Sequence, residues 1–250
     1  MLKYWVVIFS VVFFSCDNNG REKTALTIPV AHINPTKDQL ERRKQSEAYC
    51  ILHAIPVYKN TNALFVDPED TVTIRTKDEV VSRALALCFV GLKSEGLDGK
   101  LLEKIDKDYG ISSKLSPEES AYATADKPTE QQKIDANWRY EGLHVMLWAL
   151  GFVDTLSYPN KLCNVAEDVK IIHDLTEQQF REKAKLRSKK EILDQADLIL
   201  RLDWACVSAR LKNDPIPGSL DKEIVEERHH ALNWLIKYMD QDWDHVSTNT

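Results

Sequence analysis

Apolar residues recur three and four positions apart along most of the chain after residue 37, which is the spacing of one face of an α-helix. Many of these segments follow a Ser, Thr or Asn that has Glu or Gln three residues later, a pair that caps the first turn of a helix. The pairs are Thr76/Glu79, Ser116/Glu119, Thr129/Gln132, Asn164/Glu167, Thr176/Gln179 and Ser188/Glu191. With further periodic segments at 38–55 and 221–238, they predict an all-α fold of about eight or nine helices.

Residues 56–74 interrupt the helical pattern. Their apolar side chains are separated irregularly by Asn, Asp and Pro68, so that a short hairpin and an irregular packed loop both fit. Elsewhere Gly110 and Gly151 stand where helices are expected to end, because glycine readily takes the left-handed conformation that closes a helix. No repeat of about 20 to 50 residues is visible, which excludes a solenoid of identical units. A single multi-helical domain is therefore expected.

The first sixteen residues have the layout of a secretory signal. Lys3 is followed by an apolar run over residues 4–14 that only Ser10 interrupts, and then by Ser15 and Cys16. This run is shorter than the roughly 20 residues of a membrane-spanning helix. The Ser15–Cys16 junction resembles a bacterial lipoprotein processing site, with an ordinary cleaved signal as the alternative. The expected organisation is a signal peptide over 1–15, a lipidated Cys16 with a flexible tether over 16–37, and a helical domain over 38–250.

Composition and charge narrow the classes of partner. Apolar residues make up 43% of the chain and charged residues 29%, which is sufficient for a buried core. The 33 Lys and Arg against 39 Asp and Glu leave a net charge of −6, whereas binding to a nucleic-acid backbone depends on clustered positive charge. We therefore expect no nucleic-acid partner. We expect a lipid anchor at Cys16 to hold the domain at a membrane of the bacterial cell envelope, facing the periplasm or the exterior.

Four cysteines follow Cys16. In an exported protein, Cys50, Cys88, Cys163 and Cys206 could form disulfides in three pairings. Cys50, Cys88 and Cys206 each lie in an apolar helical stretch, where a thiol packs as a small core residue. Buried free thiols are therefore expected. No CxxC motif is present, so zinc-ribbon and thioredoxin chemistry have no support in the sequence.

Three predicted helices each carry charged or polar residues and a Trp three or four positions apart, so that these side chains share one face. The first line is formed by Arg187, Glu191, Asp194, Asp197, Arg201 and Trp204. The second is formed by Glu223, Glu227, His230 and Trp234, with Glu226, His229 and Asn233 one step around the helix. The third is formed by Asn137, Glu141, His144 and Trp148, next to Trp138. We call these lines the Trp–acid–Arg ridges.

Two interpretations of the ridges are open. Charged residues at this spacing form solvated faces or ion-pair networks that orient neighbouring helices, and their Trp residues fill the core. Alternatively, the ridges converge on a cleft for a sugar, a cationic ligand or a basic peptide, since a Trp ring offers an apolar face with an N–H at its edge. The candidate binding residues are Glu191, Asp194, Asp197, Arg201, Trp204, Glu227, His229, Asn233, Trp234, Trp138, Glu141 and Trp148.

A third interpretation of the same residues is a metal site. The motif Glu-x-x-His occurs at Glu141/His144 and at Glu227/His230, with Glu226/His229 as an overlapping copy, and its spacing turns both side chains of a motif to the same side. Two such motifs, with a Glu from each of two further helices, form the di-iron carboxylate constellation. The candidate ligands are Glu141 with His144, Glu227 with His230, and the single residues Glu191 and Glu79. This arrangement would predict a metal-dependent hydrolase or oxidoreductase.

Several of these motifs carry a resemblance to a known family. They include Trp138-Arg139-Tyr140-Glu141, Glu191-Ile192-Leu193-Asp194, and Glu227-Arg228-His229 followed by Asn233-Trp234. In these motifs the chain resembles the bacterial domain-of-unknown-function family 4272, over residues 38–246. The resemblance implies one helical domain and marks the ridges as signature positions, and the family has no assigned activity. From the signal layout and the ridges we expect a membrane-tethered, exported binding or interaction module whose partner is an envelope ligand or a protein, with the metal-dependent enzyme as the alternative.

Overall fold

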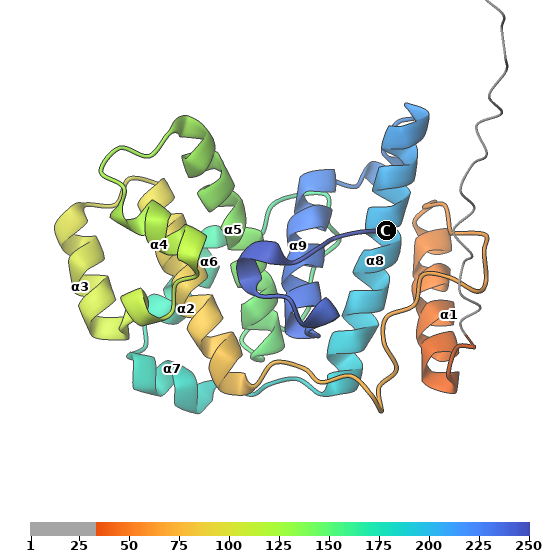
Figure 1. Cartoon of the computed structure of the whole chain (residues 1–250), viewed down its shortest axis with the longest axis horizontal. Helices are drawn as coiled ribbons and strands as arrows, with labels where there is room; N and C mark the ends of the chain where they lie inside the picture. Colours follow the sequence, from red (N-terminus) through yellow and green to blue (C-terminus); the bar gives the residue numbers. More distant parts are fainter. Residues whose placement is uncertain (1–33) are drawn as a thin grey trace, which may run out of the picture. The chain divides into compact units, whose positions relative to one another are not determined.

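Every capping pair predicted from the sequence lies at the start of a helix in the computed structural model, which describes residues 34–250 (Figure 1). In five of the six pairs, the Ser or Thr hydroxyl accepts a backbone N–H of the first turn and the Glu or Gln side chain accepts the N–H of the cap. At the sixth pair, the Asn164 side chain accepts the backbone N–H of Glu167. The first helix begins with a pair that was not predicted, in which the backbone N–H of Thr36 donates to Gln39 at 2.9 Å.

The described residues contain nine α-helices, four short 3₁₀ segments and no strand, which confirms the all-α prediction. The helices are α1 (Lys37–Leu52), α2 (Lys77–Ser94), α3 (Gly99–Tyr109), α4 (Pro117–Thr124), α5 (Glu130–Ala149), α6 (Val165–His173), α7 (Glu177–Lys183), α8 (Lys189–Lys212) and α9 (Lys222–Leu235). The 3₁₀ segments are Ile111–Ser113, Pro217–Ser219, Tyr238–Asp240 and Trp243–His245. Gly110 and Gly151 end α3 and α5 with φ of 57° and 77°, as expected for helix stops.

Five helices form the frame of the domain, and each packs against the next in the order α2, α5, α9, α8, α1. In α2 every residue from Val80 to Gly91 except Ser82 is buried, and in α5 every residue from Tyr140 to Ala149 is buried. Helices that are apolar on most of their faces belong in the interior of a helical domain. The shorter helices α3, α4, α6 and α7 pack against α2 or α5, at one end of this frame (Figure 1).

The segment 56–74 is irregular throughout, which decides between the two predicted alternatives in favour of the packed loop. Its carbonyl groups accept hydrogen bonds from side chains of the helices. Arg43 of α1 donates to three of these carbonyl oxygens over distances between 2.9 and 3.2 Å, and Arg201 of α8 donates to the carbonyl of Leu64 at 3.0 Å. Because buried backbone groups require partners, these arginines take the place of the cross-strand bonds that a hairpin would form.

Three Arg–carboxylate ion pairs within residues 34–250 are almost completely buried. They are Arg83–Glu119 at 2.8 Å, Arg201–Asp197 at 2.8 Å and Arg228–Glu141 at 2.9 Å. A buried charge destabilises the fold unless an opposite charge pairs with it. Burial of these residues therefore requires that both partners of each pair be in contact. Two of these pairs join different helices, and thereby fix α2 against α4 and α5 against α9.

All four cysteines of the described chain are free. Cys50, Cys88 and Cys206 are buried, as predicted, and Cys163 is partly exposed. Burial raises the pKa of the Cys50 thiol to about 11 and the pKa values of Cys88 and Cys206 to about 12. The three buried thiols are therefore neutral core residues at physiological pH.

The predicted signal peptide over 1–15, the lipidated Cys16 and most of the tether lie outside the described residues. The tether was expected to reach residue 37, and α1 begins there, at Lys37. Within residues 34–250, no helix combines the length and the apolar character that crossing a membrane would require.

Candidate functional site

The first two residues of the first ridge, Arg187 just before α8 and Glu191 in its first turn, join this end of α8 to α5. Arg187 donates to Glu191 at 3.0 Å and to the carbonyl oxygen of Trp148 at 2.8 Å, and its guanidinium lies 5.0 Å from the centre of the Trp148 ring. Glu191 also accepts the hydroxyl and the backbone N–H of Ser188, and these bonds lower the pKa of Glu191. This end of the ridge is therefore occupied by contacts within the fold.

The middle of the α8 ridge joins this helix to the irregular loop and to α1. Asp197 and Arg201 form a buried pair with two hydrogen bonds, at 2.8 and 3.0 Å. Arg201 also donates to the carbonyl oxygen of Leu64 and lies 3.9 Å from Glu47 of α1. Both ridge residues are 2% exposed or less, so they are not available to a partner in this arrangement.

Two further residues of the first ridge, Asp194 and Trp204, and Trp138 of the third ridge are each half-buried. Asp194 accepts a hydrogen bond from Lys190 at 2.7 Å. Trp204 packs against Tyr58, with ring centres 5.2 Å apart. The first ridge therefore does not form a single open surface.

The ridge on α9 forms pairs with α5 and α8. Glu227 lies 3.2 Å from Arg139, and burial raises the pKa of Glu227 above its ordinary value although the Arg139 charge opposes this shift. His229 Nδ1 lies 2.8 Å from Asp203, and both side chains are buried. These contacts correspond to the interpretation of the ridges as ion-pair networks that orient neighbouring helices.

The last predicted residues of α9 hold the C-terminal segment. Asn233 donates to the carbonyl oxygen of Ser247 at 2.8 Å. Trp234 is buried between the Arg75 guanidinium, 4.7 Å from its ring centre, and Trp243, whose ring centre lies 5.7 Å away. Trp234 therefore supplies core area here.

The candidate ligands of the predicted di-metal site are not brought together. Each of their carboxylates has an arginine partner of its own: Glu141 pairs with Arg228, Glu191 with Arg187, Glu227 with Arg139 and Glu79 with Arg75. His230 packs edge-on against Trp243, and burial together with the Arg139 charge lowers its pKa to about 4. Spacing along a helix places Glu and His on one face, but it does not determine which other helices that face contacts.

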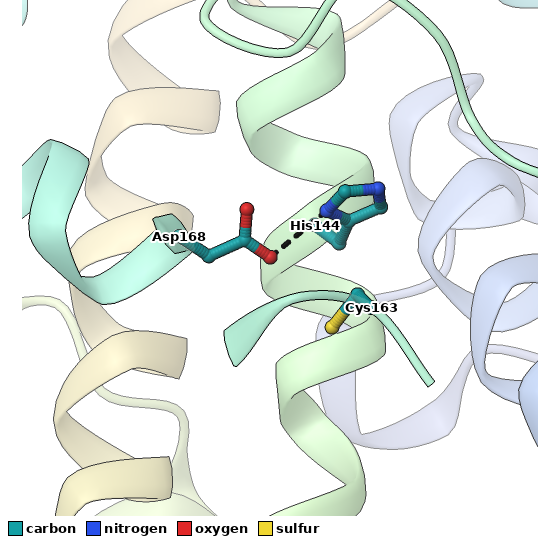
Figure 2. Close-up of side chains that lie close together, drawn as sticks. All are labelled: His144, Cys163 and Asp168. Atoms are coloured by element: carbon teal, nitrogen blue, oxygen red, sulfur yellow. Dashed lines mark hydrogen bonds and ion pairs between the residues drawn. The ribbon is translucent and has the colours of Figure 1, made fainter. Parts of the chain in front are cut away.

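A different group of potential metal ligands lies where α5 meets the start of α6 (Figure 2). His144 extends from α5, Cys163 from the loop before α6, and Asp168 from α6. One ligand atom of each residue lies within 4.8 Å of those of the other two, and residues 34–250 contain no second group of this kind. His144 Nδ1 lies 2.8 Å from Asp168 Oδ2. Asp168 is 2% and His144 8% exposed, whereas Cys163 is partly exposed.

Buried carboxylates surround the Cys163 thiol. Glu141 Oε1 accepts the backbone N–H of Cys163 at 2.6 Å, and Arg228 donates to Glu141 Oε2 at 2.9 Å. Burial raises the pKa of Cys163 well above its usual range, and the negative charges of Glu141 and Asp168 raise it further. Because the thiolate is the nucleophilic form, this environment does not activate Cys163 for a Cys–His hydrolase mechanism.

Sequence reasoning identified His144 as a potential ligand but missed Cys163 and Asp168. These two residues lie five positions apart, on either side of the cap Asn164. Five positions do not share a helix face, so a search for helical spacing does not select them. The only local signal was a cysteine at a helix start with a carboxylate in the next turn.

An apolar groove of about 870 Å³ opens between α2, α3, α6 and the start of α7. Its walls include Leu85 and Phe89 of α2, Leu101 and Ile105 of α3, and Val169 and Ile172 of α6. The volume falls in the range of about 300–1,000 Å³ that is typical of small-molecule sites. None of the predicted binding residues lines this groove, because all of them lie on α5, α8 and α9.

Helix α3 forms the outer wall of the groove. None of its residues is buried, and Leu101, which lines the groove, is 49% exposed. The Tyr109 hydroxyl lies 2.8 Å from the carbonyl oxygen of Leu175 and 3.2 Å from that of Ile172, and thereby holds the C-terminal end of α3 against the α6–α7 connection. At the other end, Gly96 turns the chain out of α2 with φ of 80°. Helix α3 is therefore held by hydrogen bonds at its C-terminal end and joined to α2 by a glycine turn at its N-terminal end.

Comparison with known proteins adds a family assignment. A family model described as "Domain of unknown function (DUF4272)" matches residues 42–246, a range that includes the ridges, the His144–Cys163–Asp168 group and the groove. No curated protein and no solved structure matches the chain.

Proposed function

We propose that this chain, which belongs to the DUF4272 family of domains of unknown function, is a binding module that takes up an apolar molecule in the groove between α2, α3, α6 and α7. The observation that carries this proposal is the groove itself, with apolar walls and a volume of about 870 Å³. Apolar surface left in contact with water is unfavourable, and a concave apolar site of this size is the usual place for a ligand.

The walls and the rim indicate the chemistry of the ligand. Charged and polar side chains lie at the edge of the groove, among them Lys104, Asp108, His173, Asp174 and Glu177. Lys104 is paired with Asp108, so this part of the rim offers no unpaired charge. A molecule with one acyl chain and one polar end, such as a fatty acid, would place its acyl chain against the walls and leave its polar end at the rim. Helix α3, at 11 residues, provides a wall about 16 Å long.

Replacement of Leu101 by Glu is expected to weaken binding of a fluorescent fatty acid by at least about tenfold. The new carboxylate would stand in the apolar wall and would have to lose water when the ligand enters, a cost that corresponds to about 1.4 kcal/mol or more. The measurement is a fluorescence titration in detergent-free buffer, with each variant made in a Cys16→Ser background so that no lipid anchor requires detergent.

Lys100→Glu is the matched control for this variant. Lys100 is exposed on the same helix and does not line the groove, so the added charge should leave probe binding unchanged. Equal probe affinity in the Leu101→Glu variant and its Cys16→Ser parent would contradict the groove as the binding site. Failure of that parent to bind any acyl-chain probe would contradict the choice of ligand.

We also propose that the module is exported and held at a bacterial envelope membrane by a lipid on Cys16. Support comes from the sequence alone: a basic residue, an apolar run over residues 4–14, and a small residue directly before Cys16. The net charge of −6 gives no support for binding an anionic lipid surface through basic residues. The ligand would then be a component of the envelope.

Cys16→Ser is expected to move the protein from the membrane fraction to the soluble fraction and to abolish its labelling by radioactive palmitate, because the variant lacks the thiol that carries the lipid. Cys206→Ser removes a different thiol, which lies outside the His144–Cys163–Asp168 group, and should change neither readout. Unchanged labelling and unchanged membrane attachment of Cys16→Ser would rule out the anchor. Fractionation and labelling of cells that produce each variant measure both quantities.

A further inference from the structure

The group at the junction of α5 and α6 combines three kinds of metal donor. An imidazole nitrogen of His144, the sulfur of Cys163 and a carboxylate oxygen of Asp168 lie within 4.8 Å of one another. The residues come from two separate segments that the fold packs together (Figure 2). We infer that His144, Cys163 and Asp168 form a binding site for one zinc ion, independently of the groove and its ligand.

The charge of Asp168 supports this inference. Its carboxylate is 2% exposed, and among residues 34–250 the basic side chain within ion-pair distance is His144, which is charged only if protonated, with neither Lys nor Arg at that distance. The neighbouring Glu141 carboxylate is neutralised by Arg228. A buried carboxylate requires a positive partner. A divalent ion held by one carboxylate, one thiolate and a neutral imidazole leaves the site with no net charge.

The donor set selects the metal. A sulfur donor disfavours Mg²⁺ and Ca²⁺, which prefer oxygen ligands, whereas a set of nitrogen, sulfur and oxygen suits Zn²⁺. Zinc ligands at about 2.0–2.3 Å from the ion in a tetrahedron lie about 3.3–3.7 Å from one another. His144 Nδ1 and Asp168 Oδ2, now 2.8 Å apart, would separate slightly, and the sulfur would approach them. The Cys163 thiol proton would pass to water as the Zn–S bond forms.

Hydrogen bonds from residues outside the group hold the backbone of Cys163 in place. Glu141 accepts the backbone N–H of Cys163 at 2.6 Å, and Arg228 donates to Glu141. Outer partners of this kind orient metal ligands and contribute to affinity. Three protein ligands leave a fourth position of the tetrahedron for water.

The test uses the full chain in detergent after removal of metal with a chelator. Zn²⁺ is titrated in competition with a chromophoric chelator, and Co²⁺ replaces Zn²⁺ for absorption spectroscopy. We expect one equivalent of Zn²⁺, and a near-ultraviolet thiolate-to-cobalt charge-transfer band. Cys163→Ser should abolish the band and reduce the Zn²⁺ affinity by more than the 10- to 100-fold that typically follows loss of an outer partner.

Cys206→Ser is the matched control, since it removes a thiol of α8 outside the group. It should leave both the stoichiometry and the band unchanged. Asp168→Asn should weaken Zn²⁺ binding while circular dichroism retains the helical signal, and it serves where Cys163→Ser fails to fold. Absence of the band in the wild type, or Zn²⁺ binding that neither Cys163→Ser nor Asp168→Asn affects, would overturn the inference.

Discussion

Replacement of Arg228 by Met is expected to lower the free energy of unfolding by about 3–5 kcal/mol, the usual cost of removing one partner of a buried ion pair. Arg228 and Glu141 are 2% and 1% exposed and are joined at 2.9 Å. Arg228 also donates to the carbonyl oxygen of Ser157 at 2.6 Å. Met fills a similar volume, so the loss would come chiefly from the unpaired Glu141 charge and the unpaired carbonyl.

Denaturant unfolding followed by circular dichroism measures this loss, with Arg210→Met as the control. Arg210 is exposed at the end of α8, so its replacement should change the free energy of unfolding by less than about 0.5 kcal/mol. Adding Glu141→Gln to Arg228→Met should restore part of the loss, because Gln carries no charge and can still accept the backbone N–H of Cys163. A loss no greater than that of Arg210→Met would show that the buried pair does not hold α5 against α9.

Replacement of glycine by Ala should change the free energy of unfolding in opposite directions at two positions where α2 and α5 pack together. A Cβ atom added to Gly91 of α2 would lie 2.5 Å from the buried Tyr140 ring of α5, well inside van der Waals contact. A Cβ added to Gly142 of α5 would lie 3.5 Å from Leu87 and Trp243, an ordinary contact. We expect Gly91→Ala to destabilise the domain by about 1–3 kcal/mol through overpacking. Gly142→Ala should stabilise it by about 0.4–1 kcal/mol.

The comparison of these two variants isolates the effect of packing. Ala has a higher helix propensity than Gly at both positions, so the difference between the two free energies of unfolding reports the clash with Tyr140. Parallel denaturant titrations provide that difference. Similar stabilities for Gly91→Ala and Gly142→Ala would mean that α2 and α5 are not in contact at Gly91.

The positions of the helix starts could be predicted from the sequence because their causes are local. Capping pairs such as Ser188/Glu191 satisfy backbone groups within one turn, so three or four neighbouring residues contain the information. The same holds for the helix end at Gly110, where a single residue supplies the left-handed conformation. The burial of Cys50, Cys88 and Cys206 likewise follows from the apolar residues around each thiol.

The contacts that the Trp–acid–Arg ridges form could be predicted only in part from the sequence. Helical spacing correctly indicated that Asp197 and Arg201 share a face, and the structure places these two in one buried pair. Spacing could not show which other element each ridge residue meets. Glu141 is bound by Arg228, which lies 87 positions further along the chain.

The sequence by itself therefore determined the helical class of the domain, the helix starts and the motifs of the family, all of which depend on residues within a few positions of one another. Only the tertiary structure decided that residues 56–74 form a loop clamped by arginines, that His144 meets Asp168 across 24 positions, and that four helices enclose an apolar groove. These features depend on contacts between segments far apart in the chain. Their geometry is set by how whole helices pack, and no local pattern of residues contains it.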